Sequence, residues 1–283
     1  MNECRIDNWG QLQDELFADS WNDELGRYRS RYAFRGLSDA SYPLQTTLSR
    51  LGGPYPELER HLLRNFKKYA HRSVVENDSV WHWLAVAQHY GLPTRLLDWT
   101  YSPYIALHFC TANIERYLLD GVIWAVNYQQ AHAQLPGALR DKLDAEGANV
   151  FTVEMLSETL PTLGDLHGLI DEDPMLFFEP PSMDDRISNQ FALFSVLPAA
   201  ETVMNDWLRT RPELWRRIII PADLKWEIRD KLDQANITER VLFPGLDGLS
   251  CWLRRHYSPK LDARKGPAGQ APLLSVASGE LVK

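Results

Sequence analysis

Helical and strand-like sequence patterns alternate along this chain of 283 residues, with no internal repeat and no low-complexity linker ahead of the C-terminus. Chains that mix the two patterns in this way pack helices around a sheet. The sequence therefore predicts an α+β fold, a single mixed domain with a small central β-sheet or split sheets flanked by helices. We expect this domain to span residues 1–258, beginning with a helical extension, and residues 259–283 to form a flexible tail rich in Gly, Ala, Ser and Pro.

Local start and stop signals predict where the elements lie. Ser79 is a good N-cap, and Gly91 followed by Pro93 ends the helix that it begins. Ser102 and Pro103 open another helix. We also expect a strand at 31–34 with a turn at Gly36, an amphipathic helix at 56–71, strands at 122–128, in MLFFEPP at 175–181 and at 218–220, an element at 186–197 that ends as a strand, a helix after Pro221 and another capped by Thr238. No element is assigned between residues 129 and 174.

The composition excludes several classes of protein. Apolar residues make up 45% and charged residues 24%, as in ordinary globular chains, so a disordered or fibrous chain is excluded. The formal net charge of −8 gives no overall attraction to nucleic acid or anionic lipid, although a local basic groove is compatible with it. Three separated cysteines, no secretory signal and no long apolar run predict a cytoplasmic protein without a membrane span.

Three segments carry polar or charged residues at the ends of apolar elements, where a rigid support can present functional groups. They are FRG at 34–36, QHYGLPTRLLDWT at 88–100 and RISNQ at 186–190. We expect the arginine of the first segment, the central block and the final glutamine to converge on one solvent-reachable hollow. The chain contains no G-x-G-x-x-G or P-loop motif, which argues against Rossmann and P-loop nucleotide sites, and no spacing indicates a metal site.

Together with the stretch ending at Arg50 and FPGLDG at 243–248, these segments resemble the FRG-domain family over roughly residues 30–255. Their order is similar, at a greater distance, to the plan of ADP-ribosyltransferases, in which an arginine ends the first core strand, a Ser/Thr strand leads into a helix and a Glu or Gln follows. The resemblance assigns these places to Arg35, to Thr100 with Ser102, and to Gln190. It implies a nucleotide ligand with NAD as the substrate, a protein or nucleic-acid acceptor, and an effector in toxin or phage-defence biology.

The side chains fit this chemistry. Arginine is well shaped for two-point contact with phosphate, so Arg35 would anchor the pyrophosphate. Gln190 would bond a ribose hydroxyl but cannot act as a general base, so the missing negative charge falls to Asp98, with Glu179 or Asp185 as alternatives. The candidate catalytic residues are Arg35, His89, Asp98 and Gln190, and the candidate NAD-binding residues are Arg35, Tyr90, Thr94, Thr100, Ser102 and Gln190.

Other interpretations of the same residues stay open. Arg35 could pair with Asp98 in the core, Arg95 could close a turn by a salt bridge to Asp98, and His89 could stabilise the end of a helix. A nucleic-acid hydrolase would use His89 and Asp98 for proton transfer, with Arg35 and Arg95 holding a phosphate. A non-enzymatic sensor would capture a nucleotide or a partner protein in the same cleft, so the sequence leaves enzymatic activity open.

Overall fold

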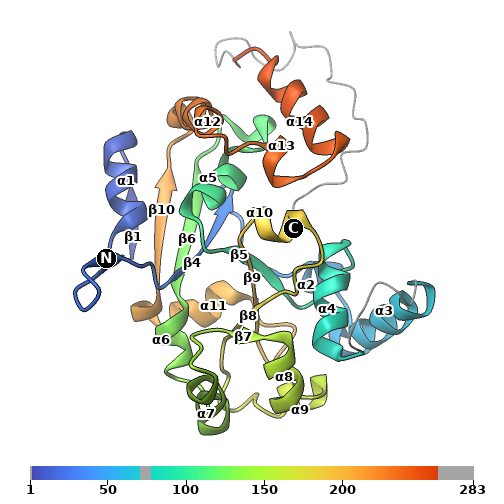
Figure 1. Cartoon of the computed structure of the whole chain (residues 1–283). Helices are drawn as coiled ribbons and strands as arrows, with labels where there is room; N and C mark the ends of the chain where they lie inside the picture. Colours follow the sequence, from blue (N-terminus) through green and yellow to red (C-terminus); the bar gives the residue numbers. More distant parts are fainter. Residues whose placement is uncertain (1, 71–77, 261–283) are drawn as a thin grey trace.

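The computed structural model describes residues 2–70 and 78–260, and its centre is a mixed eight-stranded sheet with the order β1-β10-β6-β4-β5-β9-β8-β7 (Figure 1). The strands are β1 (Glu3–Arg5), β4 (Tyr32–Leu37), β5 (Leu97–Thr100), β6 (Gly121–Asn127), β7 (Phe151–Thr152), β8 (Leu176–Glu179), β9 (Ala192–Val196) and β10 (Trp215–Ile220). The β1–β10 and β7–β8 pairs are parallel and the others are antiparallel. A separate ribbon joins β2 (Trp21–Asn22) and β3 (Arg27–Tyr28). The predicted single α+β domain is confirmed.

Helices cover both faces of this sheet. They are α1 (Trp9–Phe17), α2 (Thr47–Leu51), α3 (Tyr55–Tyr69), α4 (Val80–His89), α5 (Pro103–Thr111), α6 (Tyr128–His132), α7 (Gly137–Glu146), α8 (Val153–Thr159), α9 (Leu163–His167), α10 (Asp185–Asn189), α11 (Met204–Arg209), α12 (Lys225–Gln234), α13 (Glu239–Leu242) and α14 (Leu246–His256), with short 3₁₀ turns η2 (Ile114–Arg116), η3 (Pro212–Leu214) and η4 (Ala222–Leu224). None of the helices in the described ranges is both long and apolar enough to cross a bilayer.

Three hydrophobic clusters hold these layers together. One packs α1, α5 and α12 against β4, β6 and β10, and a second packs α4, α7 and α8 against β8 and β9. Both lie on the same face of the sheet, because Phe34 of the first cluster is opposite Thr100, and Thr100 is opposite Ala192, two residues before Phe194 of the second. A third cluster with α6 and α11 covers the other face. One face of the sheet is therefore covered by two separate helical layers.

The capping residues predicted from the sequence begin their helices as expected. The Ser79 side chain accepts a hydrogen bond from the His82 backbone N–H at the start of α4, and Ser102 does the same for Ile105 in α5. The predicted helix at 56–71 is α3, although position 71 lies outside the described residues, as does the predicted tail from residue 261 onward. The predicted strands correspond to β4, β6, β8, β9 and β10, and residues 129–174 contribute most of α6 together with α7, α8, α9 and β7.

One local prediction was wrong and another holds only in part. Gly36 does not form a turn but lies inside β4, opposite Ile123 of β6, because the strand continues to Leu37. Thr238 takes the predicted N-cap position of α13, yet its hydroxyl makes no capping bond and finds no hydrogen-bond partner among the described residues. The N-terminal residues also contribute β1 to the sheet, beside the helix α1.

Two buried histidines should make the stability of the fold sensitive to mild acid. Burial lowers the pKa of His108 from 6.5 to about 3, helped by Arg229, whose Nη1 lies 2.8 Å from His108 Nδ1. Burial also lowers the pKa of His132 to about 4, and its Nε2 accepts a bond from the Phe177 backbone N–H. Both pKa values are depressed in the folded state, so the unfolded chain binds more protons as the pH falls below 6.5 and stability is lost. We expect a free energy of unfolding that is lower at pH 5 than at pH 7 by about 2 kcal/mol per histidine, measured by urea denaturation. Equal values at the two pH values would contradict this.

Candidate functional site

The strands β4 and β5 diverge at the centre of the sheet. They pair at one register position, Phe34 with Thr100, whereas β4 pairs with β6 at six positions. Continuation of the antiparallel register would place Gly36 opposite Asp98. The Nη1 atom of Arg35 instead donates a 2.5 Å hydrogen bond to the Asp98 carbonyl oxygen, so this carbonyl has a donor although the strands no longer pair there. We call this divergence the β4–β5 fork.

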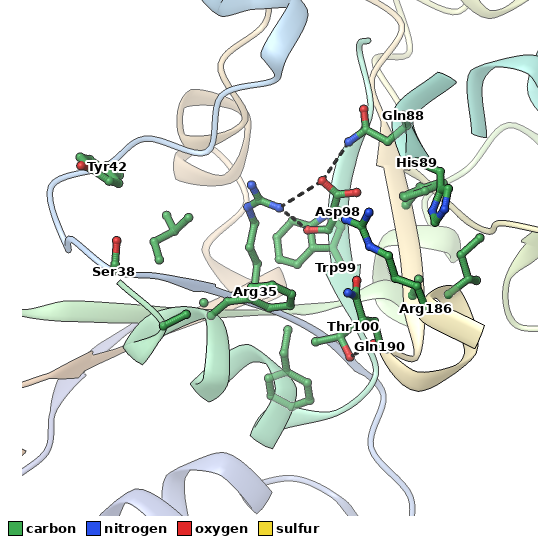
Figure 2. A pocket seen from close by; sticks show the side chains of 18 of the residues that line it. Arg35, Ser38, Tyr42, Gln88, His89, Asp98, Trp99, Thr100, Arg186 and Gln190 are labelled. Atoms are coloured by element: carbon green, nitrogen blue, oxygen red, sulfur yellow. Dashed lines mark hydrogen bonds and ion pairs between the residues drawn. The ribbon is translucent and has the colours of Figure 1, made fainter. Parts of the chain in front are cut away.

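A pocket with about 1150 Å³ of empty space, part of it open to solvent, lies over the fork (Figure 2). Its walls come from α4 on one side, α5 on the other, and α10 with β9, so it occupies the gap between the two helical layers on that face. The lining includes Arg35, Ser38, Tyr42, Arg50, Gln88, His89, Asp98, Thr100, Phe109, Arg186 and Gln190. The pocket is thus built from segments far apart in the sequence.

The pocket is positively charged although the chain is acidic. Three arginines line it, Arg35, Arg50 and Arg186, and among the described lining residues Asp98 is the one carboxylate. Burial lowers the pKa values of Arg35 and Arg186, and the nearby Asp98 charge opposes this. Arginine nevertheless stays a cation in proteins. An excess of cations in a partly enclosed hollow favours an anionic ligand.

Asp98 is fixed in place yet open to the pocket. Its Oδ2 accepts a 2.8 Å hydrogen bond from Gln88 Nε2 and lies 3.9 Å from Arg35 Nη1, as the dashed lines in Figure 2 show. The side chain keeps 37% of its surface exposed, whereas that of Arg35 keeps 7%. The guanidinium of Arg186 points toward Asp98 from α10 (Figure 2). A carboxylate held in this way can face a developing positive charge on a ligand.

Thr94 supports this carboxylate from behind. Its hydroxyl donates to Gln88 Oε1 at 2.5 Å and accepts from the Leu96 backbone N–H at 3.2 Å, and the residue is buried. The chain of bonds therefore runs from Thr94 through Gln88 to Asp98. Thr94 does not itself line the pocket, so its predicted contact with NAD has no support in the geometry.

We expect Thr94→Val to lower the free energy of unfolding by about 1–3 kcal/mol, because it removes the buried hydroxyl that bonds Gln88 Oε1 and the Leu96 backbone N–H. Urea denaturation would measure this. Thr94→Ser keeps the hydroxyl and serves as the matched control, so it should restore most of the loss. A Val variant as stable as the parent protein would show that these bonds contribute nothing.

The structure brings the other predicted catalytic residues to the same pocket. His89, at the end of α4, has its Nε2 2.8 Å from Asp184 Oδ2. Thr100 donates a 2.8 Å bond to the Gln190 carbonyl, and the Gln190 amide donates to the Leu242 carbonyl at 2.9 Å. Gln190 therefore connects β5, α10 and α13, and its amide nitrogen is engaged with the protein.

Several predicted residues lie elsewhere. Tyr90 and Ser102 do not line the pocket: Tyr90 is 65% exposed after the end of α4, and Ser102 caps α5. Glu179, also outside the lining, accepts a bond from the Tyr101 hydroxyl, and Asp185 lies in the first turn of α10. These positions leave Asp98 as the carboxylate that meets the pocket.

Arg95 does not form the salt bridge to Asp98 that the sequence suggested. Arg95 is buried and pairs with buried Glu59 of α3, with Nη2 and Oε2 2.5 Å apart. This ion pair leaves Arg95 outside the pocket lining. A phosphate-binding role for Arg95, as the hydrolase hypothesis requires, has no support in the geometry.

The sequence indicates no ligand role for Arg50 or Gln88 and does not distinguish a structural role from a ligand role for Arg186. A signal for Arg186 was present, because it precedes Gln190 by four residues, the spacing that places two side chains on one helix face. Gln88 was visible only as the first residue of the central block. Among the described residues, no group of three His, Cys, Asp or Glu side chains is placed to hold a metal ion.

Comparison with known proteins gives one match. Residues 30–117 match the sequence model of the FRG domain, and no curated protein and no solved structure matches the chain. The matched segment contains Arg35, Arg50, Gln88, His89 and Asp98, which is most of the charged and polar lining of the pocket. Residues 186–190 and the elements α13 and α14 lie beyond it.

Proposed function

We propose that the pocket over the β4–β5 fork is the ligand site of the FRG domain, whose model residues 30–117 match, and that it binds a nucleotide, with NAD as the substrate. One observation carries the proposal. A single hollow that is partly open to solvent combines three arginines with a partly exposed carboxylate that the protein holds in place. Arginines recognise phosphate oxygens, and the carboxylate supplies the opposite charge.

The proposed reaction is cleavage of the bond between nicotinamide and ribose. The electron pair of this bond leaves with the nicotinamide, whose ring becomes neutral, so the leaving group needs no proton. Positive charge develops on the ribose, and Asp98 would stabilise it while Arg35 and Arg186 hold the pyrophosphate. A nucleophile on a protein or nucleic-acid acceptor then gives ADP-ribosyl transfer, and water gives hydrolysis. Such an activity would suit a toxin or a phage-defence effector.

A second candidate is hydrolysis of RNA or another nucleic acid. It is supported by the contact between His89 and Asp184, since a carboxylate that orients an imidazole favours proton transfer. In this version Asp184 is the carboxylate partner of His89, in the place that sequence reasoning gave to Asp98. Arg35 and Arg186 would then steady a phosphate.

The test is to incubate the purified chain with NAD and to measure released nicotinamide, in parallel with labelled single-stranded RNA. Nicotinamide release that is lost in Arg186→Gln, with unchanged circular dichroism, supports the first proposal. RNA cleavage lost in His89→Gln supports the second. Saturable NAD binding with neither product would overturn both reactions and favour a non-enzymatic nucleotide sensor.

A further inference from the structure

The pocket wall formed by α10 rests on the C-terminal helices rather than on the sheet alone. In Figure 1, α13 lies next to α10. The last carbonyls of a helix have no partner within the helix. In α13 these are the carbonyls of Val241 and Leu242, which accept bonds from the side-chain amides of Asn189 and Gln190, both at 2.9 Å. The end of α10 is therefore tied to the end of α13 at two points.

Phe243, the first residue of the FPGLDG motif, supports two residues of the pocket lining. The Arg186 guanidinium carbon lies 5.2 Å from the centre of its ring, within the range of a cation–π interaction. The same ring meets Phe109 of α5 edge to face, with the centres 6.2 Å apart and the planes at 85°. Arg186 and Phe109 line the pocket, whereas Phe243 does not. Phe243 can therefore act on a ligand only through its neighbours.

A buried cluster of ion pairs joins α12, α13 and α14, and Phe243 directly follows α13. Arg255 of α14 pairs with Glu239 of α13 at 2.5 Å and with Asp233 of α12 at 2.7 Å, and Arg229 of α12 lies 3.2 Å from Asp233. Arg255 and Glu239 are buried and Arg229 is fully enclosed. These pairs involve none of the α10 residues that line the pocket. The position of Phe243 is thus set independently of the side chain that it supports.

We propose that Phe243 is a positioning residue that holds the Arg186 guanidinium in its ligand-binding orientation. This inference rests on the proposed function, in which Arg186 binds phosphate. A free arginine side chain has many rotamers, and fixing one of them before the ligand arrives lowers the entropic cost of binding. The aromatic ring attracts the cation without itself lining the pocket and leaves the N–H donors available.

Calorimetric titration with inorganic pyrophosphate tests the proposal. We expect Phe243→Leu to weaken binding about three- to tenfold, and Phe243→Tyr, which keeps the ring face, to bind like the parent. In an Arg186→Gln background Phe243→Leu should have no further effect, because its action passes through Arg186. An equal loss in both backgrounds would overturn the proposal. Tyr257→Leu, which also replaces an aromatic ring by Leu but at an 80% exposed position beyond α14, is the control and should leave binding unchanged.

A second measurement needs no ligand. The ring of Phe243 should shift the NMR signal of the Arg186 Nε–H group upfield, and Arg186→Gln identifies that signal by its absence. We expect the shift to disappear in Phe243→Leu and to persist in Phe243→Tyr. An unchanged Arg186 signal in the Leu variant would overturn the positioning role. Failure of the parent protein to bind pyrophosphate, with the shift lost as expected, would instead overturn phosphate binding and leave the contact between the two side chains established.

Discussion

Replacing Asp98 by Asn is expected to slow nicotinamide release from NAD about 10²–10³-fold, the effect of removing one preorganised electrostatic partner of a transition state. The cause is the loss of the negative charge that faces the developing charge on the ribose. Binding of the nucleotide phosphates should not weaken. The lost carboxylate lies 3.9 Å from Arg35, so its removal leaves the Arg35 guanidinium with one competing anion fewer. We therefore expect ADP, measured by calorimetry, to bind the variant as tightly as the parent or more tightly, so that the loss is in kcat.

The geometry makes this substitution a clean one. Arg35 bonds the backbone carbonyl of Asp98, which the substitution leaves in place. Gln88 donates to one carboxylate oxygen, and the amide oxygen of Asn can accept the same bond. The β4–β5 fork should consequently keep its shape, which circular dichroism and the urea midpoint would verify.

Two other carboxylates provide matched controls. Glu179→Gln and Asp185→Asn also remove one negative charge each, but neither side chain lines the pocket. Both variants should release nicotinamide at the parent rate. Full activity in Asp98→Asn, or an equal loss in all three variants, would exclude Asp98 as the group that stabilises the ribose cation.

Local chemistry explains which parts of the fold the sequence predicts. Ser79 and Ser102 begin helices because a capping bond needs only the next three residues. The residue pattern alone does not predict β5 as a strand, because Asp98 and Thr100 are polar and interrupt the apolar run, so a strand at Thr100 was implied only by the resemblance to ADP-ribosyltransferases. The pairing of β1 with β10 joins residues 3–5 to residues 217–219, and a strand of three residues is too short to show a recognisable sequence pattern.

The sequence likewise predicts some features of the candidate site and misses others. The sequence predicts that Arg35, His89, Asp98 and Gln190 belong together, and the structure places all four around one pocket. It does not predict the partner of Arg95, because spacing suggests a carboxylate three residues away, whereas the real partner lies on α3. Spacing also cannot distinguish a side chain that lines the pocket from one that supports such a side chain. Gln88 lines the pocket, whereas Thr94 only bonds to Gln88.

Gly36→Ala is expected to destabilise the protein by more than about 3 kcal/mol, enough to unfold much of a marginally stable domain. A methyl group on Gly36 would lie 1.7 Å from the Ala106 carbonyl oxygen and 2.9 Å from the Cys110 backbone nitrogen. Both atoms belong to the backbone of α5, so trimming a side chain cannot relieve the clash. The glycine of the FRG tripeptide is therefore required because α5 crosses β4 at that point in direct contact.

The same contact links stability to the pocket. Gly36 and the α5 residue Phe109 both line it, so a shift of α5 away from the added methyl group would also move a wall of the ligand site. Thermal and urea denaturation of the variant measure the first effect, and pyrophosphate titration of any folded fraction measures the second. Gly137→Ala is the matched control, because no atom lies within 4 Å of its added methyl group and Gly137 is exposed at the start of α7. That variant should be as stable as the parent or slightly more stable. A Gly36→Ala protein with the same unfolding midpoint as Gly137→Ala would show that α5 can move away at no cost, and the structural reason for the glycine would be lost.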